Sequence, residues 1–197
     1  EDIAIDLFNK KKNNGFYVDI GAHHPIQRNN THLLFKKGWQ GINIDVNQFS
    51  IDLFNFLRPN DLNLQVAVSD REGDISFFYQ KKFSQLNTTD KKIAEENFHG
   101  KFQERKVKCQ TIKNILDNSK YKNKKIDFLN IDVEGADFEV LQSLDFNLYR
   151  PKVICVEIDE KEYEKSEIYN FLKILKYTKK WSGTLSYLFV DDLYNFS

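Results

Sequence analysis

The sequence predicts an α/β fold in which helices cover a mostly parallel sheet. The main observation is a strand–turn–helix–strand unit within residues 16–47. Two apolar runs, at 16–20 and 41–44, are separated by a Gly-containing turn and a helix-like segment at 29–37. Such a unit is the building block of a parallel sheet covered by helices. A second observation is that apolar runs and amphipathic segments keep alternating along the rest of the chain.

In the first half of the chain, the spacing of apolar residues and the signals for helix starts and ends predict the secondary-structure elements. Residues 3–12 have the period of a helix, and Pro59 stops the helix that follows the first unit. Thr111 can cap a later helix. A strand at 74–80 is expected to continue as a hairpin from the turn at 69–73. The other elements expected here are a helix at 49–57, a strand at 62–68, a short helix at 90–98, a strand at 105–110 and a helix at 112–116.

The second half of the chain predicts further strands around two helices. Pro151 opens one of the apolar runs, and Gly183 lies in a three-residue turn that can join the last two strands as a hairpin. The segment at 166–175 is strongly amphipathic. The elements expected are strands at 126–131 and 152–158, helices at 136–143 and 166–175, and closing strands at 177–181 and 185–190.

A polar segment at 81–104 is the least regular part of the chain. Long irregular segments in compact domains are usually lids, binding loops or disordered. Within it, residues 85–101 and their neighbour Phe102 carry enough apolar side chains to dock reversibly. We therefore expect a mobile lid that covers the substrate side of a site and sets specificity for the acceptor. A surface loop remote from the site remains the alternative.

Length and composition restrict the class of protein. The chain has 197 residues, which we expect to form one domain over residues 1–197, and its 29 basic residues equal its 29 acidic residues. Zero net charge argues against a general nucleic-acid binder. Cys109 and Cys155 lie in strand-like runs and are expected to be buried free thiols, which fits a reducing cytoplasm. No apolar run is long enough to span a membrane, and no signal peptide is visible. Without any Met, the chain is expected to be trimmed at its start.

Carboxylates end the two strands of the first unit. Asp19 precedes Gly21, whose backbone can approach a ligand closely, and Asp45 is suited to accept hydrogen bonds from a ribose diol. A dinucleotide site would require G-x-G-x-x-G, but His23 and Pro25 stand where further glycines would fall. S-adenosylmethionine has no phosphate and demands less of this turn. Capping of turns by the two acids is the alternative to ligand binding.

Four motifs in this order resemble the FkbM-type methyltransferases. They are YVDIGAHHP, GWQGINIDVN, VAVSDREGDISFF and IDFLNIDVEGADFEVLQSLDF, and the resemblance runs from about residue 16 to residue 158. It implies the class I S-adenosylmethionine-dependent fold, a Rossmann-like three-layer sandwich. The family has a seven-stranded sheet of order 3-2-1-4-5-7-6 with an antiparallel last strand. It also implies O-methylation of a small molecule, often a sugar, a glycan component or a natural product.

The resemblance implies roles for individual residues of the cofactor site. Asp19, Gly21 and Ala22 match the motif that holds the methionine part of the cofactor, and Asp45 matches the ribose acid. Other matched residues are Val68 and Ser69 on the adenine side, Asp132 beside the reactive methyl group, and Asn30 and Thr31 near the cofactor carboxylate. His23 belongs to the same loop but stands at a position that is usually small, and Asn130 replaces a Lys common in this family.

An acceptor hydroxyl must lose a proton, so a base within reach helps. His24 is the first candidate, because histidine has a suitable unperturbed pKa; a structural histidine bonded within its turn is the alternative. The other candidates are His23, Asp132 and Glu134. Carboxylates at strand ends could instead hold Mg²⁺, with capping or surface carboxylates as the alternative. The residues expected for such a site are Asp132, Glu157 and Asp159.

Three function classes follow from the sequence. The first is an S-adenosylmethionine-dependent O-methyltransferase acting on a small polar or carbohydrate-type acceptor. The second is a Rossmann-type oxidoreductase, disfavoured by the missing glycines. The third is a non-catalytic nucleotide-binding module on the same fold. The sequence specifies neither the acceptor nor the oligomeric state.

Overall fold

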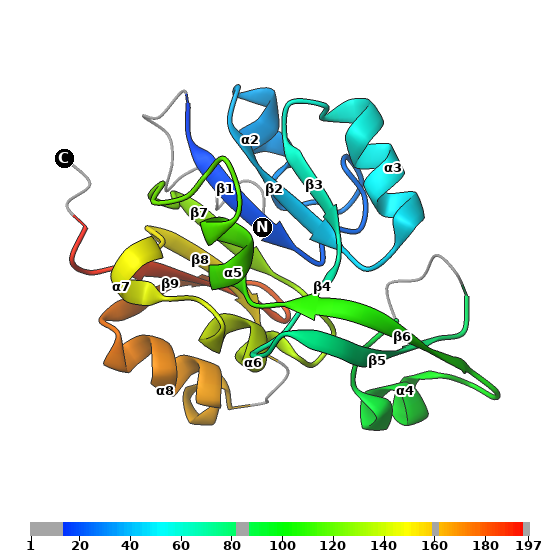
Figure 1. The fold of residues 1–197 in the computed structure, drawn as a ribbon. Helices are drawn as coiled ribbons and strands as arrows, with labels where there is room; N and C mark the ends of the chain where they lie inside the picture. Colours follow the sequence, from blue (N-terminus) through cyan, green and yellow to red (C-terminus); the bar gives the residue numbers. More distant parts are fainter. Residues whose placement is uncertain (1–13, 82–86, 159–161, 195–197) are drawn as a thin grey trace.

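A seven-stranded sheet forms the centre of the protein, which is represented by a computed structural model that describes residues 14–81, 87–158 and 162–194 (Figure 1). Its order is β3-β2-β1-β7-β8-β10-β9. Only β10 runs antiparallel to its neighbours, so the sheet is mostly parallel. The strands are β1 (Phe16–Ile20), β2 (Gln40–Asp45), β3 (Leu62–Gln65), β7 (Phe128–Ile131), β8 (Val153–Glu157), β9 (Tyr177–Ser182) and β10 (Ser186–Asp191).

A second, three-stranded sheet of order β4-β6-β5 lies beside the first. Its strands are β4 (Ala67–Val68), β5 (Gly73–Tyr79) and β6 (Gln103–Gln110). The three strands of this second sheet take the numbers 4 to 6, so the labels of the large sheet do not read 3-2-1-4-5-7-6 as predicted. Counted within the large sheet alone, the strands lie in the order 3-2-1-4-5-7-6.

Two expectations for this region are wrong. The strand expected at 62–68 is broken, because β3 pairs with β2 whereas β4 pairs with β6 of the second sheet. The expected hairpin between this strand and β5 does not form either. β4 and β5 both pair with β6, which lies between them. The pairing partner of β4 and β5 is thus β6, which follows the segment 80–102 in the chain. We call this segment the insertion.

Helices cover both faces of the large sheet. Leu34 of α2 (His32–Lys36) packs on one face, beside α3 (Gln48–Leu57). On the opposite face pack α5 (Ile112–Asp117), α6 (Asp137–Gln142), α7 (Phe146–Tyr149) and α8 (Glu167–Ile174). The insertion carries α4 (Lys91–Asn97), and a short 3-10 helix, η1 (Tyr163–Lys165), follows β8. No helix in the described part of the chain combines the length and apolar character needed to cross a membrane.

Most expected helices are confirmed within a few residues. Side-chain caps explain where several begin, as when Thr111 accepts a hydrogen bond from Asn114 N–H and Asp90 caps α4. The helix α7 is not among those that the sequence predicts, and the helix expected at 3–12 lies outside the described residues. Cys109 and Cys155 are buried thiols, as predicted.

Strand alternation sends neighbouring residues of β1 to opposite faces. Phe16 and Val18 join the apolar cluster under α5, α6 and α8, whereas Tyr17 joins the cluster on the α2 face. Because side chains alternate along a strand, Asp19 faces the same side as Tyr17. Its carboxylate is therefore directed beneath the loop that follows β1, where it is fully buried.

Asp19 belongs to a buried polar network centred on Arg58. Asp19 accepts hydrogen bonds from Thr31 Oγ1 at 2.7 Å, from Asn29 Nδ2 at 3.0 Å and from Asn130 Nδ2 at 2.9 Å. Burial raises the pKa of Asp19, and these donors together with the Arg58 charge oppose that rise. The donors therefore stabilise a carboxylate that water does not reach.

Arg58 follows α3 and is also buried. Its guanidinium donates to Thr31 Oγ1 and Asn29 Oδ1, both at 2.8 Å, and to the carbonyl oxygen of Pro25. It also lies over the ring of Phe35, 4.9 Å from the ring centroid. A guanidinium fork thus holds the loop that connects β1 to α2, and this loop carries part of the candidate site.

Replacing Arg58 by Met should destabilise the protein by about 3–5 kcal/mol. The buried carboxylate of Asp19 would remain without the nearby positive charge, and the oxygen atoms of the loop would lose their hydrogen-bond donor. Urea unfolding at pH 7.5 measures the loss, and Lys180→Met on the exposed part of β9 is the control. We expect the control to lie within about 0.5 kcal/mol of the parent. Equal stability of the two variants would contradict a central role for Arg58.

Candidate functional site

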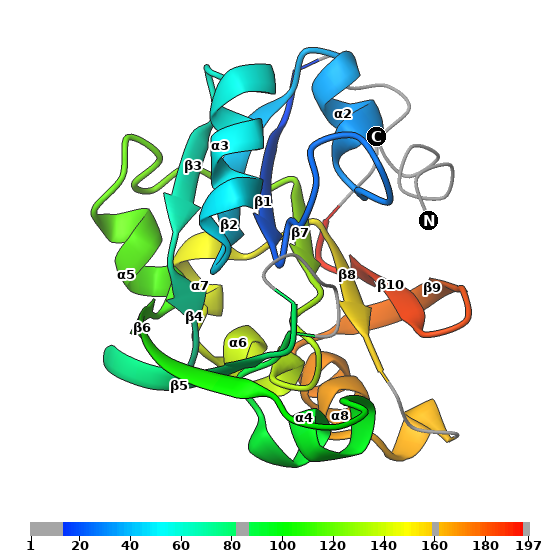
Figure 2. The ribbon, with the colours of Figure 1, turned by 90° about the vertical axis from the view of Figure 1, so that its right-hand side faces the viewer.

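A pocket opens at the carboxyl ends of β1, β2 and β7. Figure 2 shows the second sheet and α4 lying across from these strand ends, and the opposite wall of the pocket is lined by Val68, Phe77 and residues 87–89. The space between these walls is about 790 Å³ when the mouth that opens to solvent is included. Ligands of open α/β sheets bind at this edge. The pocket is therefore the candidate functional site.

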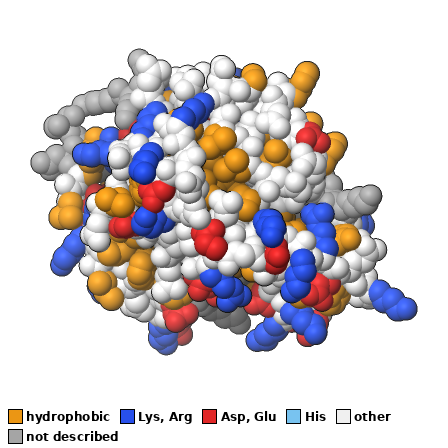
Figure 3. All heavy atoms as spheres, in the orientation of Figure 1, with side chains coloured by type: hydrophobic (Ala, Val, Ile, Leu, Met, Phe, Trp, Pro, Cys, Tyr) orange, Lys and Arg blue, Asp and Glu red, His pale blue; other side chains and the backbone are white. Residues whose placement is uncertain are grey.

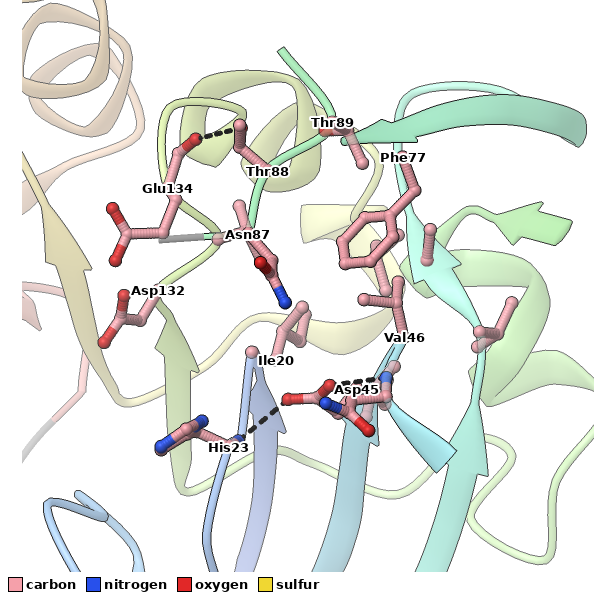
Figure 4. Close-up of a pocket in the computed structure, with 17 residues that line it drawn as sticks. Ile20, His23, Asp45, Val46, Phe77, Asn87, Thr88, Thr89, Asp132 and Glu134 are labelled. Atoms are coloured by element: carbon pink, nitrogen blue, oxygen red, sulfur yellow. Dashed lines mark hydrogen bonds between the residues drawn. The ribbon is translucent and has the colours of Figure 1, made fainter. Parts of the chain in front are cut away.

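Asp45, at the end of β2, is the acid on the floor of the pocket (Figure 4). Its carboxylate accepts hydrogen bonds from His23 N–H at 2.9 Å and from Asn47 N–H at 2.7 Å. Burial raises the pKa of Asp45 to about 6 despite these two donors, and the charge of Asp19 adds to the rise. A ligand that donates further hydrogen bonds would favour the ionised form.

The part of the pocket beyond Asp45 is apolar. It is lined by Val46, Val66, Ala67, Val68 and Phe77. Arg105 of β6 covers this wall from outside, with its guanidinium 5.3 Å from the centroid of the Phe77 ring and a 3.2 Å hydrogen bond to the Val46 carbonyl oxygen. The slot is suited to a flat apolar or aromatic group.

The opposite end of the pocket is acidic. Asp132 and Glu134 belong to the turn at 132–135, here called the acidic turn, and lie side by side in Figure 4. Glu134 has a left-handed backbone, with φ at 55°, which few non-glycine residues adopt. Asp137 at the start of α6 holds this turn, because its buried carboxylate accepts from Val133 N–H and Gly135 N–H, both at 3.2 Å.

A third acid, Glu157 at the end of β8, completes a cluster. Among the described residues, Asp132, Glu134 and Glu157 each offer a carboxylate oxygen, and these oxygens all lie within 4.8 Å of one another. Carboxylate oxygens are the ligands that Mg²⁺ and Ca²⁺ prefer. Asp132 and Glu157 of this cluster are two of the acids that the sequence suggests for a metal site, and the third, Asp159, lies outside the described residues.

Gly21 lets the loop after β1 approach the loop after β7. A Cβ at this position would lie 1.7 Å from the carbonyl oxygen of Asp132, and the glycine has φ at 76°. The neighbouring amide of Asp132 donates to Ile20 O at 3.1 Å. The close approach brings the acidic turn to the edge of the pocket.

The structure divides the predicted cofactor residues into two groups. Those that line the pocket are Gly21, His23, Asp45, Val68 and Asp132. Those that do not line it are Asp19, Ala22, Asn30, Thr31 and Ser69. Asp19 and Thr31 are committed to the Arg58 network, and Asn30 donates to Asn130 Oδ1 at 3.0 Å. In the structure these three side chains form hydrogen bonds within the protein and support the loop.

His24, the first candidate base, does not line the pocket either. Its Nδ1 accepts hydrogen bonds from Ile26 N–H and Gln27 N–H, both at 3.1 Å. An Nδ1 that accepts two hydrogen bonds places the proton of the neutral ring on Nε2. His24 therefore holds its turn, in agreement with the structural alternative that the sequence leaves open. His23 does reach the pocket, and burial lowers the pKa of its imidazole.

The insertion also contributes to the pocket. Asn87, Thr88 and Thr89 line it, so the segment expected as a lid at 85–101 reaches the site. These residues lie beside Asp45 and the apolar slot as well as beside the acidic turn, whereas the sequence suggests the substrate side alone. The sequence offers no signal for Arg58, which looks like a helix stop. Asp137, in contrast, stands two residues after the motif D-V-E-G.

Comparisons with known proteins yield one family match. The family model described as Methyltransferase FkbM domain matches residues 19–181. A comparison with curated proteins found no match. A comparison with solved structures found none either.

Gly21→Ala should cost about 1–3 kcal/mol more than Gly73→Ala, since overpacking adds to backbone strain only at Gly21. Gly73 has an even larger positive φ, 125°, but a methyl group added there would meet no other atom within 4 Å. Chemical unfolding of both variants measures the difference. If the two losses are equal, the close approach to Asp132 does not constrain the fold.

Proposed function

Because the chain belongs to the FkbM methyltransferase family, we propose that it transfers the methyl group of S-adenosylmethionine to a hydroxyl of a small polar acceptor. A carbohydrate-type acceptor, such as a sugar of a surface glycan or its precursor, is part of this proposal. The observation that carries it is the pocket at the strand ends. The pocket combines an acid suited to a ribose, Asp45, with an apolar slot on one side and the acidic turn on the other.

The pocket residues fit the cofactor part by part. Asp45 would accept hydrogen bonds from the ribose diol, and the slot beside Val46 and Phe77 would take the adenine. The acidic turn would lie beside the cationic sulfonium. Asn87 lines the same pocket, and its buried Oδ1 has no hydrogen-bond partner among the described residues. A buried acceptor without a partner calls for a donor, and both the adenine amine and the ribose could supply one.

The backbone around Gly21 argues against a dinucleotide. A pyrophosphate is bound by free backbone N–H groups of the turn and the helix start. Here Gly21 N–H and Ala22 N–H both donate to Ile44 O, at 3.0 and 3.1 Å, and His23 N–H donates to Asp45. These amides are thus engaged within the protein. An oxidoreductase with a dinucleotide cofactor is therefore the weaker proposal.

The proposed reaction requires that the protein position the acceptor hydroxyl and provide a group that accepts its proton. The cofactor supplies an electrophilic methyl group when bound. The pocket walls exclude water and align the acceptor oxygen, and such alignment supplies a large part of the rate. Asp132 and Glu134 are the proposed proton acceptors, since both line the pocket and His24 does not. If a divalent cation takes part, Glu157 would join these two acids in holding it.

Calorimetric titration with S-adenosylhomocysteine and with NAD⁺ tests the proposed function. We expect the first to bind and the second not to bind. The acceptor is then sought by transfer of a radiolabelled methyl group to panels of sugars and glycan precursors. Binding of NAD⁺ without binding of S-adenosylhomocysteine would favour the oxidoreductase, and binding without any transfer would favour a non-catalytic module.

Asp45→Ala should weaken S-adenosylhomocysteine binding by about 1.5–3 kcal/mol, the scale of hydrogen bonds to a charged group, and leave the fold intact. In the parent, binding should also weaken as the pH falls below about 6, the pKa to which burial raises the Asp45 carboxyl. The ionised form accepts the diol, so affinity is retained above pH 6 and is lost below it, by roughly tenfold at pH 5. Calorimetry at several pH values measures both effects.

The pH dependence should be absent from Asp45→Ala. Asp137 has a raised pKa of about 6 as well and remains in this variant, so it serves as an internal control. A pH dependence that persists in Asp45→Ala would assign the effect to Asp137, and an unchanged dissociation constant would refute the ribose role of Asp45.

Asp132→Asn should lower turnover by roughly 10²–10⁴-fold, the usual contribution of a general base, with little change in thermal stability. Glu139→Gln, on the exposed side of α6, is the matched control and should keep its activity. We expect exhaustive chelation of the parent by EDTA to leave turnover unchanged. Activity that is lost with EDTA and restored by Mg²⁺ would instead assign the three acids to a metal.

A further inference from the structure

The insertion packs as a unit of its own. Phe78 of β5, Ala94 of α4, Phe98 and Phe102 form an apolar cluster separate from the two clusters of the large sheet. Phe78 and Thr88 pair as an antiparallel bridge, with hydrogen bonds of 2.8 and 3.1 Å between their backbones. The bridge fixes Thr88 to the second sheet. In Figure 3, Lys and Arg side chains lie among Asp and Glu over the second sheet, where Lys108 pairs with Asp74 at 3.0 Å.

Thr88 connects this unit to the acidic turn. Thr88 is 1% exposed, and its Oγ1 donates to the carbonyl oxygen of Glu134 at 2.7 Å, as Figure 4 shows. The same Oγ1 accepts from Asp90 N–H at 3.0 Å. Asp90 in turn caps α4 by accepting from Lys92 N–H and Ile93 N–H. One hydroxyl therefore joins the start of α4 to the left-handed Glu134.

Ile93 makes a second contact with the same turn. A Cβ added to Gly135 would lie 1.9 Å from Ile93 Cδ1, so the Ile93 side chain occupies the space that this glycine leaves open. Gly135 has φ at 98°. From the other side, Asp137 holds the turn through the amides of Val133 and Gly135. The acidic turn is thus clamped between α6 and the insertion.

We propose that Thr88, with Ile93, is a positioning residue that sets the orientation of the Asp132 and Glu134 carboxylates. The insertion then acts on the reacting end of the site through the backbone of Glu134, in addition to lining the pocket. The Thr88 hydroxyl thereby adds to the hold that Asp137 has on the same turn. The choice of ligands for testing this inference rests on the proposed function, whereas the contacts of Thr88 and Ile93 do not depend on it.

Three variants test the inference. Thr88→Val keeps the shape of the side chain and removes the hydroxyl, Thr88→Ser restores the hydroxyl, and Gln80→Ala is the matched control. Gln80 is exposed and donates to His99 O at 2.7 Å within the insertion. Amide hydrogen exchange without ligand is measured first. We expect Val133 and Gly135 to exchange about fivefold faster in Thr88→Val, the scale of one lost hydrogen bond, and at the parent rate in the other two variants.

Binding supplies the second measurement and needs no acceptor. S-adenosylmethionine is a sulfonium cation and S-adenosylhomocysteine is not, so their affinity ratio reports the acids near the sulfur. In Thr88→Val we expect the relative affinity for the cation to fall by about threefold or more, the scale of a modest change in charge contacts, while adenosine binds as in the parent. Thr88→Ser should return the ratio to that of the parent.

The two measurements separate the possible outcomes. A lower melting temperature in Thr88→Val with unchanged exchange and an unchanged affinity ratio would show that Thr88 only stabilises the insertion, and would overturn the inference. An equal loss of affinity for all three ligands would make Thr88 a binding residue and also overturn it. If the parent binds neither cofactor form, the proposed function fails, and the exchange rates alone decide the inference.

Discussion

The buried contact between Asp19 and the Arg58 network is the constraint on which the candidate site depends. Two opposite charges without water are stable only when hydrogen bonds satisfy nearly all their polar atoms. Here the loop after β1 supplies those groups through Asn29, Thr31 and the Pro25 carbonyl oxygen. Since the loop cannot move without unpairing a charge, the backbone N–H of His23 stays directed at Asp45. A network outside the pocket thus orders the pocket.

Local sequence patterns predict the elements of this fold well but not all of their partners. Phe16–Ile20 and the run ending at Ile158 are strands because apolar side chains fill both faces. Caps such as Thr111 mark helix starts. The segment 62–68 looks like one strand because an apolar run does not say where the chain leaves a sheet. Likewise, the turn at 69–73 suggests a hairpin, whereas β6 intervenes from far along the chain. Pairing between distant segments leaves no local signature.

The site is predictable where parallel strands end and less so elsewhere. Asp45 and Asp132 reach the pocket because carboxyl ends of parallel strands share one edge of the sheet. Asp19 does not reach it, and alternation along β1 already puts this acid on the side of Tyr17. Arg58 could not be foreseen, because charged side chains are seldom fully buried and a helix followed by Pro suggests a solvated end. The roles of Asn87 and Thr88 depend on how the insertion folds back, which composition does not reveal.

The position of β6 at the centre of the second sheet has a kinetic consequence. Ala67 pairs with Cys109 across the whole of β5 and the insertion, so Val68 and Phe77 can form one wall only after this long segment has returned. The loop-closure entropy of non-local pairing is lost before its contacts are gained, which slows such steps. The strands β1 and β2, joined by a short crossover, can pair earlier. The β1–β2 part of the ligand-binding edge can therefore form before this wall, whereas β7 joins the edge from still farther along the chain.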